Sequence, residues 1–281
     1  MGGKVTIVGQ GLAGTCLAWR LWDRGQDFCL VHRGHRRSAS FISAGLLTPV
    51  TGRKLNPSWR LEEFLSEARA FYQGVEMVLG EQFFHEVPIV RLFADADERS
   101  RFDRKRDVVD QWVSEFLEQE NCPYNAPHGG VIWQGGGWLD TRRFLEASRG
   151  YFREAGLIEV QEVDLEKPLP DGGVTVLCAG AAGLGAGPFG FLPERRAKGE
   201  LLTVRILGFP ENRIVSCNGW LVPLGGALFR AGATYCWDDL TDTTTRNGRA
   251  QIEELIRSFT SLPCEVLEHV AGGRPIVRQS R

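Results

Sequence analysis

The stretch from Lys4 to Val31 constrains the fold of this chain more than any other part of the sequence. It opens with the β-branched apolar run VTIV, which is typical of a buried parallel strand. Three glycines follow with the spacing G-x-G-x-x-G, and an amphipathic segment leads from them to a second apolar run, FCLV. Strand, glycine turn, helix and strand within about 30 residues is the context in which this motif predicts a dinucleotide-binding unit.

The three glycines of this motif have different physical roles. Gly9 permits the tight turn, Gly11 lets the backbone approach a pyrophosphate, and Gly14 lets the helix pack closely against the strand. The pyrophosphate then lies at the helix N-terminus, beside Leu12 and Ala13, where free N–H groups and the helix dipole favour an anion. The motif therefore predicts that these five residues bind a dinucleotide cofactor.

The end of the second strand departs from the usual pattern of such a unit. An Asp or Glu usually stands there and accepts hydrogen bonds from the adenosine ribose. Here the position is His32, followed by Arg33 and by further basic residues at positions 35, 36 and 37. Taken alone, this basic cluster suggests a 2′-phosphate and hence NADP, whereas a ring nitrogen of His32 is also able to bond a ribose hydroxyl. The motif predicts a dinucleotide without deciding which one.

Composition and charge exclude several classes of protein. The chain has 281 residues and a formal net charge of −2, so its length allows one or two domains and its charge gives no broad basic surface for nucleic acid. No apolar run approaches the length of a membrane-spanning helix, and the first strand begins too early for a signal peptide. The 7 cysteines are scattered without a C-x-x-C motif, so we expect reduced, mostly core residues of a cytoplasmic protein.

A second segment rich in glycine and hydroxyl residues, SASFISAGLLTPVTG, occupies residues 38–52. Small residues crowded after a strand suit a backbone that lies against a ligand, and serine side chains suit phosphate or ribityl oxygens. An ordinary surface loop is the alternative interpretation of these residues.

Together, GQGLAG and SASFISAGLLTPVTG resemble the FAD-dependent oxidoreductases of the D-amino-acid oxidase, glycine oxidase and sarcosine oxidase type. They are also similar to the oxidoreductase half of the bifunctional enzymes that mature the wobble uridine of tRNA. Three further strings, GGWLDTRRFL, KGELL and AGATY, resemble landmarks of the same family. The resemblance implies FAD rather than NADP as the cofactor.

The resemblance further implies an α/β fold, in which a Rossmann-like parallel sheet binds FAD and a second, mostly antiparallel sheet (α+β) binds the substrate. The expected FAD-binding domain is discontinuous and comprises residues 1–80, 138–198 and 271–281. The expected substrate domain comprises residues 81–137 and 199–270.

Individual residues of the cofactor site follow from the same resemblance. Besides the glycine motif, His32 and Arg33, the residues expected to bind FAD in the second segment are Ser38, Ser40, Ala44, Gly45, Leu46 and Thr48. Val163 is expected to touch the adenine through its backbone. Cys178, Ala179 and Gly180 are expected to pass the pyrophosphate, and no metal site is expected.

Arg274 lies in a G-x-R-P segment, where the resembled family has an arginine that binds the substrate carboxylate over the flavin ring. The planar fork of a guanidinium suits a carboxylate because it pairs with both oxygens. A surface or interdomain ion pair is the alternative role for Arg274.

Hydrophobic periodicity and turn residues predict the remaining elements. We expect helices at 61–79, 98–120, 141–155 and 248–259, and strands at 83–93, 158–163, 174–178 and 264–270. Pro88 indicates an edge or a bulge, and Asp140 is well placed as a helix N-cap. Short strands between residues 195 and 234 are expected to continue the antiparallel sheet.

These expectations together predict an enzyme that oxidises a small amine or amino acid by hydride transfer to N5 of the flavin. Its pocket would be formed by Arg91, Trp220 and Tyr235, with Arg274 as the carboxylate clamp. The resembled family continues past this arginine whereas the chain ends at Arg281, so a truncated, inactive flavoprotein fragment is one alternative. An NADP-dependent reductase and a tRNA-modifying oxidoreductase are two others, the last weakened by the net charge of −2.

Overall fold

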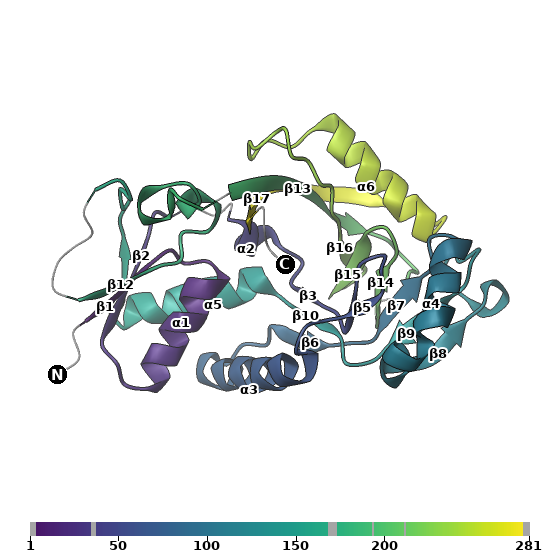
Figure 1. The fold of residues 1–281 in the computed structure, drawn as a ribbon, viewed down its shortest axis with the longest axis horizontal. Coiled ribbons are helices and arrows are strands. Elements are labelled where there is room, and N and C mark those ends of the chain that lie inside the picture. Colours follow the sequence, from purple (N-terminus) through teal and green to yellow (C-terminus); the bar gives the residue numbers. More distant parts are fainter. Residues whose placement is uncertain (1–3, 35–37, 168–172, 193, 211, 278–281) are drawn as a thin grey trace.

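Two main sheets organise the chain, as Figure 1 shows for the computed structural model, which describes residues 4–34, 38–167, 173–192, 194–210 and 212–277. The first sheet has four parallel strands in the order β11–β2–β1–β12. Their bounds are Val5–Val8 for β1, Phe28–His32 for β2, Ile158–Val160 for β11 and Val174–Leu177 for β12. The two apolar runs of the N-terminal motif are therefore neighbouring strands, as predicted, and they lie at the centre of this sheet.

Helices α1 (Leu12–Asp23) and α5 (Thr141–Glu154) pack together beside the parallel sheet. Trp19 of α1 is 2% exposed, and its Nε1 donates to Oγ of Ser148 at 2.8 Å. The two helices share a hydrophobic core with the sheet and with α3 (Leu61–Leu79), which has the predicted bounds. The α5 helix begins where Asp140 accepts a hydrogen bond from the backbone N–H of Arg143 at 3.0 Å, which confirms the predicted N-cap.

The second sheet has eight strands in the order β17–β13–β16–β15–β14–β7–β9–β8 and is antiparallel apart from the β14–β7 pair. The bounds of its strands are Ile89–Leu92 (β7), Val113–Leu117 (β8), Gly130–Trp133 (β9), Glu194–Arg205 (β13), Ile214–Ser216 (β14), Trp220–Gly225 (β15), Leu228–Gly232 (β16) and Glu265–Val277 (β17). Helix α6 (Arg246–Phe259) covers one face, where its Ile252, Ile256 and Phe259 share a core with Phe229. A parallel sheet combined with a larger, mostly antiparallel sheet is the predicted fold class.

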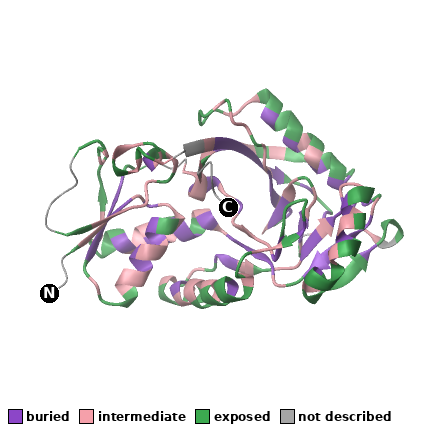
Figure 2. Cartoon of the chain, viewed as in Figure 1, coloured by how far each residue is buried: buried purple, intermediate pink, exposed green. Residues whose placement is uncertain are grey.

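The long strands β13 and β17 connect the two halves of the molecule. They form one long antiparallel ladder, in which Glu194 is opposite Val277 at one end and Arg205 is opposite Glu265 at the other. The register shifts once, between Thr203 and Val204. In Figure 1 they arch from above helix α2 (Ala39–Ile42), in the middle of the molecule, towards the other strands of the large sheet. Figure 2 shows that much of β13 is buried, whereas the outer surface of α3 is exposed.

Smaller elements fill the space between the sheets. They are helix α2 (Ala39–Ile42), a sheet of β3 (Leu46–Leu47), β10 (Gly137–Leu139) and β6 (Phe84–Glu86), and the pair β4 (Val50–Thr51) and β5 (Asn56–Pro57). The hydroxyl-rich segment thus contributes both α2 and β3. It lies against β10 because Leu46 pairs with Trp138.

The structure corrects several predicted elements. The predicted helix at 98–120 ends much earlier, since α4 (Ala96–Val109) is followed by β8, an edge strand that pairs with β9. The predicted strand at 83–93 is two strands on different sheets, because Pro88 has no N–H to continue one ladder. The predicted strand at 264–270 continues to Val277 because β13 pairs with it throughout.

Val163 also lies outside the strand in which it was predicted. The N–H of Gln161 donates to the carbonyl of His32 at 2.9 Å, and β2 ends at that residue. Beyond this bond the neighbouring strand has ended, so residues 161–164 have no regular structure.

None of the helices in the described part of the chain combines the length and the apolar character that crossing a membrane requires.

Candidate functional site

The glycine turn after β1 is closed so tightly that two of its glycines have no room for a side chain. Gly9 has φ +110°, and a Cβ there would lie 2.4 Å from the carbonyl oxygen of Cys178. A Cβ on Gly14 would lie 1.9 Å from the carbonyl oxygen of Gly9. Gly11 precedes α1 in an extended conformation and gives it no side-chain cap. The N–H of Leu12 donates to Ser40, so the backbone N–H groups that an anion is able to bind are those that follow Leu12 in the first turn.

Residues 38–43 lie beside this turn. Oγ of Ser40 accepts a hydrogen bond from the N–H of Leu12, the first residue of α1, at 3.1 Å. Ser38 caps α2 by accepting from the N–H of Phe41 at 3.2 Å. The structure therefore brings the two serines predicted from the second segment to the same corner as the glycine motif.

The continuation of this segment is held against β10. Gly45 has φ +63°, a Cβ there would lie 1.9 Å from the carbonyl oxygen of Leu139, and the N–H of Leu139 donates to the carbonyl of Gly45 at 3.0 Å. Ala44 is buried, and the hydroxyl of Thr48 donates to the carbonyl of Val50 at 2.8 Å. Residues 44–48 therefore contribute mainly backbone atoms to the candidate site.

His32 is 8% exposed and lies at the C-terminal end of β2. Its Nδ1 accepts a hydrogen bond from the N–H of Gly34 at 3.0 Å, and its Nε2 is buried without a partner among the described residues. Burial lowers the pKa of His32, and the charges of Arg149 and Arg153 lower it further. The imidazole is therefore neutral near pH 7 with its proton on Nε2, which is an unsatisfied donor at the position where a cofactor ribose is expected. Arg33 next to it is exposed.

Cys178, Ala179 and Gly180 follow β12 and complete the corner. The N–H of Cys178 donates to the carbonyl of Val8 at 2.7 Å, and Gly180 (φ +59°) begins a short 3₁₀ helix, η3 (Gly180–Gly183). The backbone at Cys178 thus passes directly over the glycine turn. Val163, by contrast, lies half-buried past the end of β11.

Sequence patterns did not point to two polar residues at this corner, Gln10 and Arg149. Gln10 is 7% exposed, its Nε2 donates to the carbonyl of Leu145 at 2.9 Å, and its Oε1 accepts from Nε of Arg149 at 2.6 Å. Leu145 and Arg149 are one turn apart on α5, and this i, i+4 spacing is the only local signal that they share a face.

Arg274 lies near the end of β17 and is exposed. Its guanidinium carbon is 5.0 Å from the centre of the Tyr235 ring, and no carboxylate among the described residues forms an ion pair with it. The neighbouring Gly273 approaches Ala181 of η3, since a Cβ on Gly273 would lie 3.9 Å from that of Ala181. The structure therefore brings Arg274 and Tyr235 together, next to the segment that follows Gly180.

The other two predicted pocket residues, Arg91 and Trp220, line a cavity of about 180 Å³ between residues 46–52 and the large sheet. Leu46 and Thr48 line it too, so it adjoins the second segment, whereas Tyr235 does not line it. Arg91 donates to the carbonyl of Cys217 at 2.8 Å and forms an ion pair with the fully buried Glu98. Because this carboxylate already neutralises Arg91, the cavity has a polar wall without a free cation.

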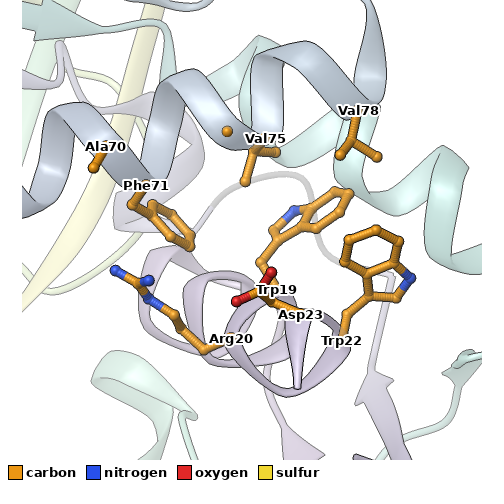
Figure 3. Close-up of a pocket in the computed structure, with 9 residues that line it drawn as sticks. Trp19, Arg20, Trp22, Asp23, Ala70, Phe71, Val75 and Val78 are labelled. Atoms are coloured by element: carbon orange, nitrogen blue, oxygen red, sulfur yellow. The ribbon is translucent and has the colours of Figure 1, made fainter. Parts of the chain in front are cut away.

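A further cavity of about 170 Å³ lies between α1 and α3 and is shown in Figure 3. Its lining includes Trp19, Trp22 and Phe71, and Arg20 lies with its guanidinium carbon 4.6 Å from the centre of the Phe71 ring. None of the residues predicted for the cofactor or the substrate lines it.

Comparison with solved structures shows the same fold in glycine oxidases and in an L-proline dehydrogenase. The glycine oxidase of Geobacillus kaustophilus matches with a TM-score of 0.81 at 20% identity, over 98% of this chain and 83% of that one. The glycine oxidase of Bacillus cereus matches with a TM-score of 0.80 at 22% identity, over 98% and 83%. The L-proline dehydrogenase of P. horikoshii matches with a TM-score of 0.72 at 15% identity, over 97% and 81%.

Comparison with curated sequences finds longer relatives. The tRNA 5-methylaminomethyl-2-thiouridine biosynthesis bifunctional protein MnmC of Burkholderia mallei is 25% identical over 295 aligned residues, which cover 93% of this chain. The protein of the same name from Burkholderia thailandensis is 26% identical over 302 residues, which cover 95% of this chain. The chain spans 44% and 45% of the length of these two relatives.

Residues 4–281 match the family described as FAD dependent oxidoreductase, DAO. The match covers the glycine turn, the second segment and Arg274, and the family's cofactor is FAD, as the sequence predicted. The chain therefore belongs to the DAO family of FAD-dependent oxidoreductases.

Proposed function

We propose that this chain binds FAD and oxidises a small amine or amino acid at the carbon that carries the nitrogen. The observation that carries the substrate assignment is the state of Arg274, which is exposed, lies over the Tyr235 ring and has no ion pair with a carboxylate among the described residues. A guanidinium with its fork free is suited to a carboxylate, with which it forms two parallel hydrogen bonds. The proposed substrates are therefore amines that carry a carboxylate.

The proposed FAD site combines three features of the structure. The glycine turn is closed by tight backbone packing at Gly9 and Gly14, α1 has no cap from Gly11, and Nε2 of His32 is an orphaned buried donor. The first two features suit a pyrophosphate, and the third suits a ribose hydroxyl. The residues that we assign to FAD are Gly9, Gly11, Leu12, Ala13, Gly14, His32, Arg33, Ser38, Ser40, Ala44, Gly45, Leu46, Thr48, Val163, Cys178, Ala179 and Gly180.

When bound, FAD supplies the acceptor for the hydride of the substrate carbon. The chain itself contributes binding and orientation. Arg274 holds the carboxylate, and the aromatic ring of Tyr235 fixes the guanidinium plane. Trp220 and Leu46 form apolar walls of the adjoining cavity, where they exclude water from the rest of the substrate.

The test is the bleaching of flavin absorbance when substrates are added without oxygen to the FAD-loaded protein. We expect amino acids to reduce the flavin, and we expect Arg274→Leu to weaken the apparent affinity for them while leaving amines without a carboxylate unaffected. The control is Arg257→Leu, at an exposed arginine on α6. Equal affinity of the wild type and Arg274→Leu for every carboxylate-bearing substrate would refute the clamp.

A second candidate is action on an aminomethyl group of a tRNA base, because curated relatives carry tRNA 5-methylaminomethyl-2-thiouridine biosynthesis in their names. The net charge of −2 weighs against a broad tRNA-binding surface. Filter binding at two salt concentrations separates the two candidates. Salt-sensitive retention of tRNA by the protein would favour the second, and retention no greater than that of a bovine albumin blank would exclude it.

We also propose a cytoplasmic location, on the evidence of the cysteines. All 7 are free thiols, and 6 of them are buried or half-buried. Burial raises the pKa of several, including Cys16 and Cys178, which keeps them in the unreactive thiol form. Free thiols are the usual state in a reducing compartment.

A further inference from the structure

Arg230 is a buried arginine on the large sheet that neither sequence pattern nor family resemblance singles out. It is 8% exposed and lies in the middle of β16, opposite Thr203 of β13 and Val222 of β15. Its neighbour Phe229 packs in the core beneath α6. Since side chains alternate along a strand, Arg230 points to the face of the sheet that α6 does not cover.

On that face Arg230 reaches the second segment. Its Nη1 donates to the carbonyl oxygen of Ser43 at 3.2 Å and to that of Ile42 at 3.4 Å. These are the last two residues before Ala44 and Gly45, which belong to the proposed flavin site. The hydroxyl of Thr141 donates to the same carbonyl of Ser43 at 3.1 Å, so the end of α2 is held from two sides.

The charge of Arg230 has no carboxylate partner at ion-pair distance in the described part of the chain. Two acidic groups, Glu268 and Asp140, act on it from beyond that distance; Glu268 is already paired with Arg142, and Nε of Arg230 is buried without a partner among the described residues. Burial lowers the pKa of this guanidinium and the charge of Arg142 lowers it further, but an arginine keeps its proton at neutral pH. A buried cation without a direct ion pair is costly, so its presence calls for an explanation beyond the stability of the fold.

We propose that Arg230 is a positioning residue for FAD, which holds the carbonyls of Ile42 and Ser43 so that the backbone of residues 44–46 faces the flavin, and which places a positive charge behind that backbone. This inference rests on the proposed FAD site and not on the oxidation of amines. The orientation of the segment sets FAD affinity, and the charge favours the more negative, reduced state of the flavin.

The experiment compares Arg230→Met, Arg230→Lys and a control, Arg205→Met, by titrating each apoprotein with FAD and measuring the flavin spectrum and the reduction potential. Arg205 is on β13 of the same sheet and forms an exposed ion pair with Glu265. We expect Arg230→Met to weaken FAD binding about tenfold or more, as for the loss of a hydrogen bond from a charged donor. We also expect it to shift the visible spectrum of bound FAD and to lower the reduction potential. Arg230→Lys keeps the charge and one donor, so it should recover most of these properties, and Arg205→Met should match the wild type.

The fold of each variant is followed by far-UV circular dichroism and thermal unfolding of the apoprotein. Because methionine removes an unpaired buried charge, Arg230→Met should unfold at or above the wild-type temperature. An unfolded Arg230→Met would overturn the proposal, since it would show that Arg230 supports the whole fold. Wild-type affinity, spectrum and potential in Arg230→Met would also overturn it. If the wild type binds FAD but oxidises no amine, the proposed reaction is refuted and the comparison of the Arg230 variants stays valid. If the wild type does not take up FAD, the proposed FAD site and the role of Arg230 are both refuted.

Discussion

Arg149 on α5 donates from Nε to Oε1 of Gln10 at 2.6 Å, and the same glutamine donates to the carbonyl of Leu145 at 2.9 Å. Gln10 is the variable residue between the first two glycines of the motif, and it is 7% exposed. The glycine turn is therefore fixed from outside by α5, in addition to its own close packing.

Replacement of Gln10 by Ala should lower the free energy of unfolding by about 1–3 kcal/mol, because it removes the hydrogen bonds that join Gln10 to the carbonyl of Leu145 and to Nε of Arg149. It should also weaken FAD binding. Urea denaturation and FAD titration measure the two effects. Gln134→Ala serves as the control, since Gln134 is exposed and its substitution should change stability by no more than about 0.5 kcal/mol.

Replacement of Gly14 by Ala should be severely destabilising, because the new Cβ would lie 1.9 Å from the carbonyl oxygen of Gly9 and neither backbone can move away. The matched control is Gly150→Ala in the middle of α5, where no atom lies within 4 Å of the new Cβ. That variant should be stabilised by about 0.5–1 kcal/mol through the greater helix propensity of alanine. Thermal unfolding of both apoproteins gives the comparison, and equal unfolding temperatures would contradict the packing argument.

The stability of the protein should fall as the pH drops below about 6.5 partly because of His32, whose ordinary pKa is about 6.5. Its folded-state pKa is lowered by burial, Arg149 and Arg153, so below pH 6.5 the unfolded chain binds a proton that the folded protein resists. Stability is therefore complete above the ordinary pKa and is lost as the pH falls towards the folded-state value. His32→Asn should flatten this dependence, which for one proton is at most about 1.4 kcal/mol per pH unit.

The measurement is urea denaturation of the wild type and His32→Asn at several pH values. Burial also lowers the pKa of His85, whose ring stacks on Trp138 with 4.4 Å between the ring centres. The variant His85→Asn is therefore measured in the same way, to separate the contribution of His85 from that of His32. Parallel curves for the wild type and His32→Asn would show that His32 does not titrate in this way.

Removal of one partner of the Arg91–Glu98 pair should cost far more than removal of both. Glu98 is fully buried and Arg91 is 12% exposed, so Glu98→Leu alone leaves a buried cation and should cost about 3–5 kcal/mol. The double variant Arg91→Met with Glu98→Leu should lie near the wild type in stability. Guanidinium denaturation of the four proteins of this cycle tests the coupling, and the exposed pair Arg106–Asp110 should give no more than about 1 kcal/mol in the same cycle. Additive single effects at Arg91 and Glu98 would show that their charges do not compensate each other.

Local patterns were enough to predict the parallel strands, the glycine turn and the three well-capped or strongly amphipathic helices α3, α5 and α6. Each of these has its signal within one window of sequence, such as Asp140 before the apolar stripe of α5. Residues 113–117 were predicted as helix because their apolar positions continued the stripe of α4. Their strand conformation depends on β9, which supplies the partner ladder and leaves no local mark at residues 113–117.

The residues of the candidate site also fall into those that the sequence predicted and those that it did not. The glycine motif and the serines at 38 and 40 were recognisable because their spacing has a mechanism, and the structure brings them together. Glu98, Arg149 and Arg230 were not recognised, because each acts on a residue from a distant element. The residues that were predicted to form one pocket lie in two places. Arg91 is paired with the buried Glu98, whereas Tyr235 lies beneath Arg274.

The order of strands in the parallel sheet has a consequence for how the chain is made. β1 is synthesised well before one of its two neighbours, β12, which consists of residues 174–177. At a synthesis rate of about 5–20 residues per second, β1 has one open edge for on the order of ten seconds or more. The backbone of Cys178, which packs against the glycine turn at Gly9, is absent during this interval. Interleaved pairing of this kind gives a high contact order and slow folding, and it makes the early chain dependent on protection of its apolar strands.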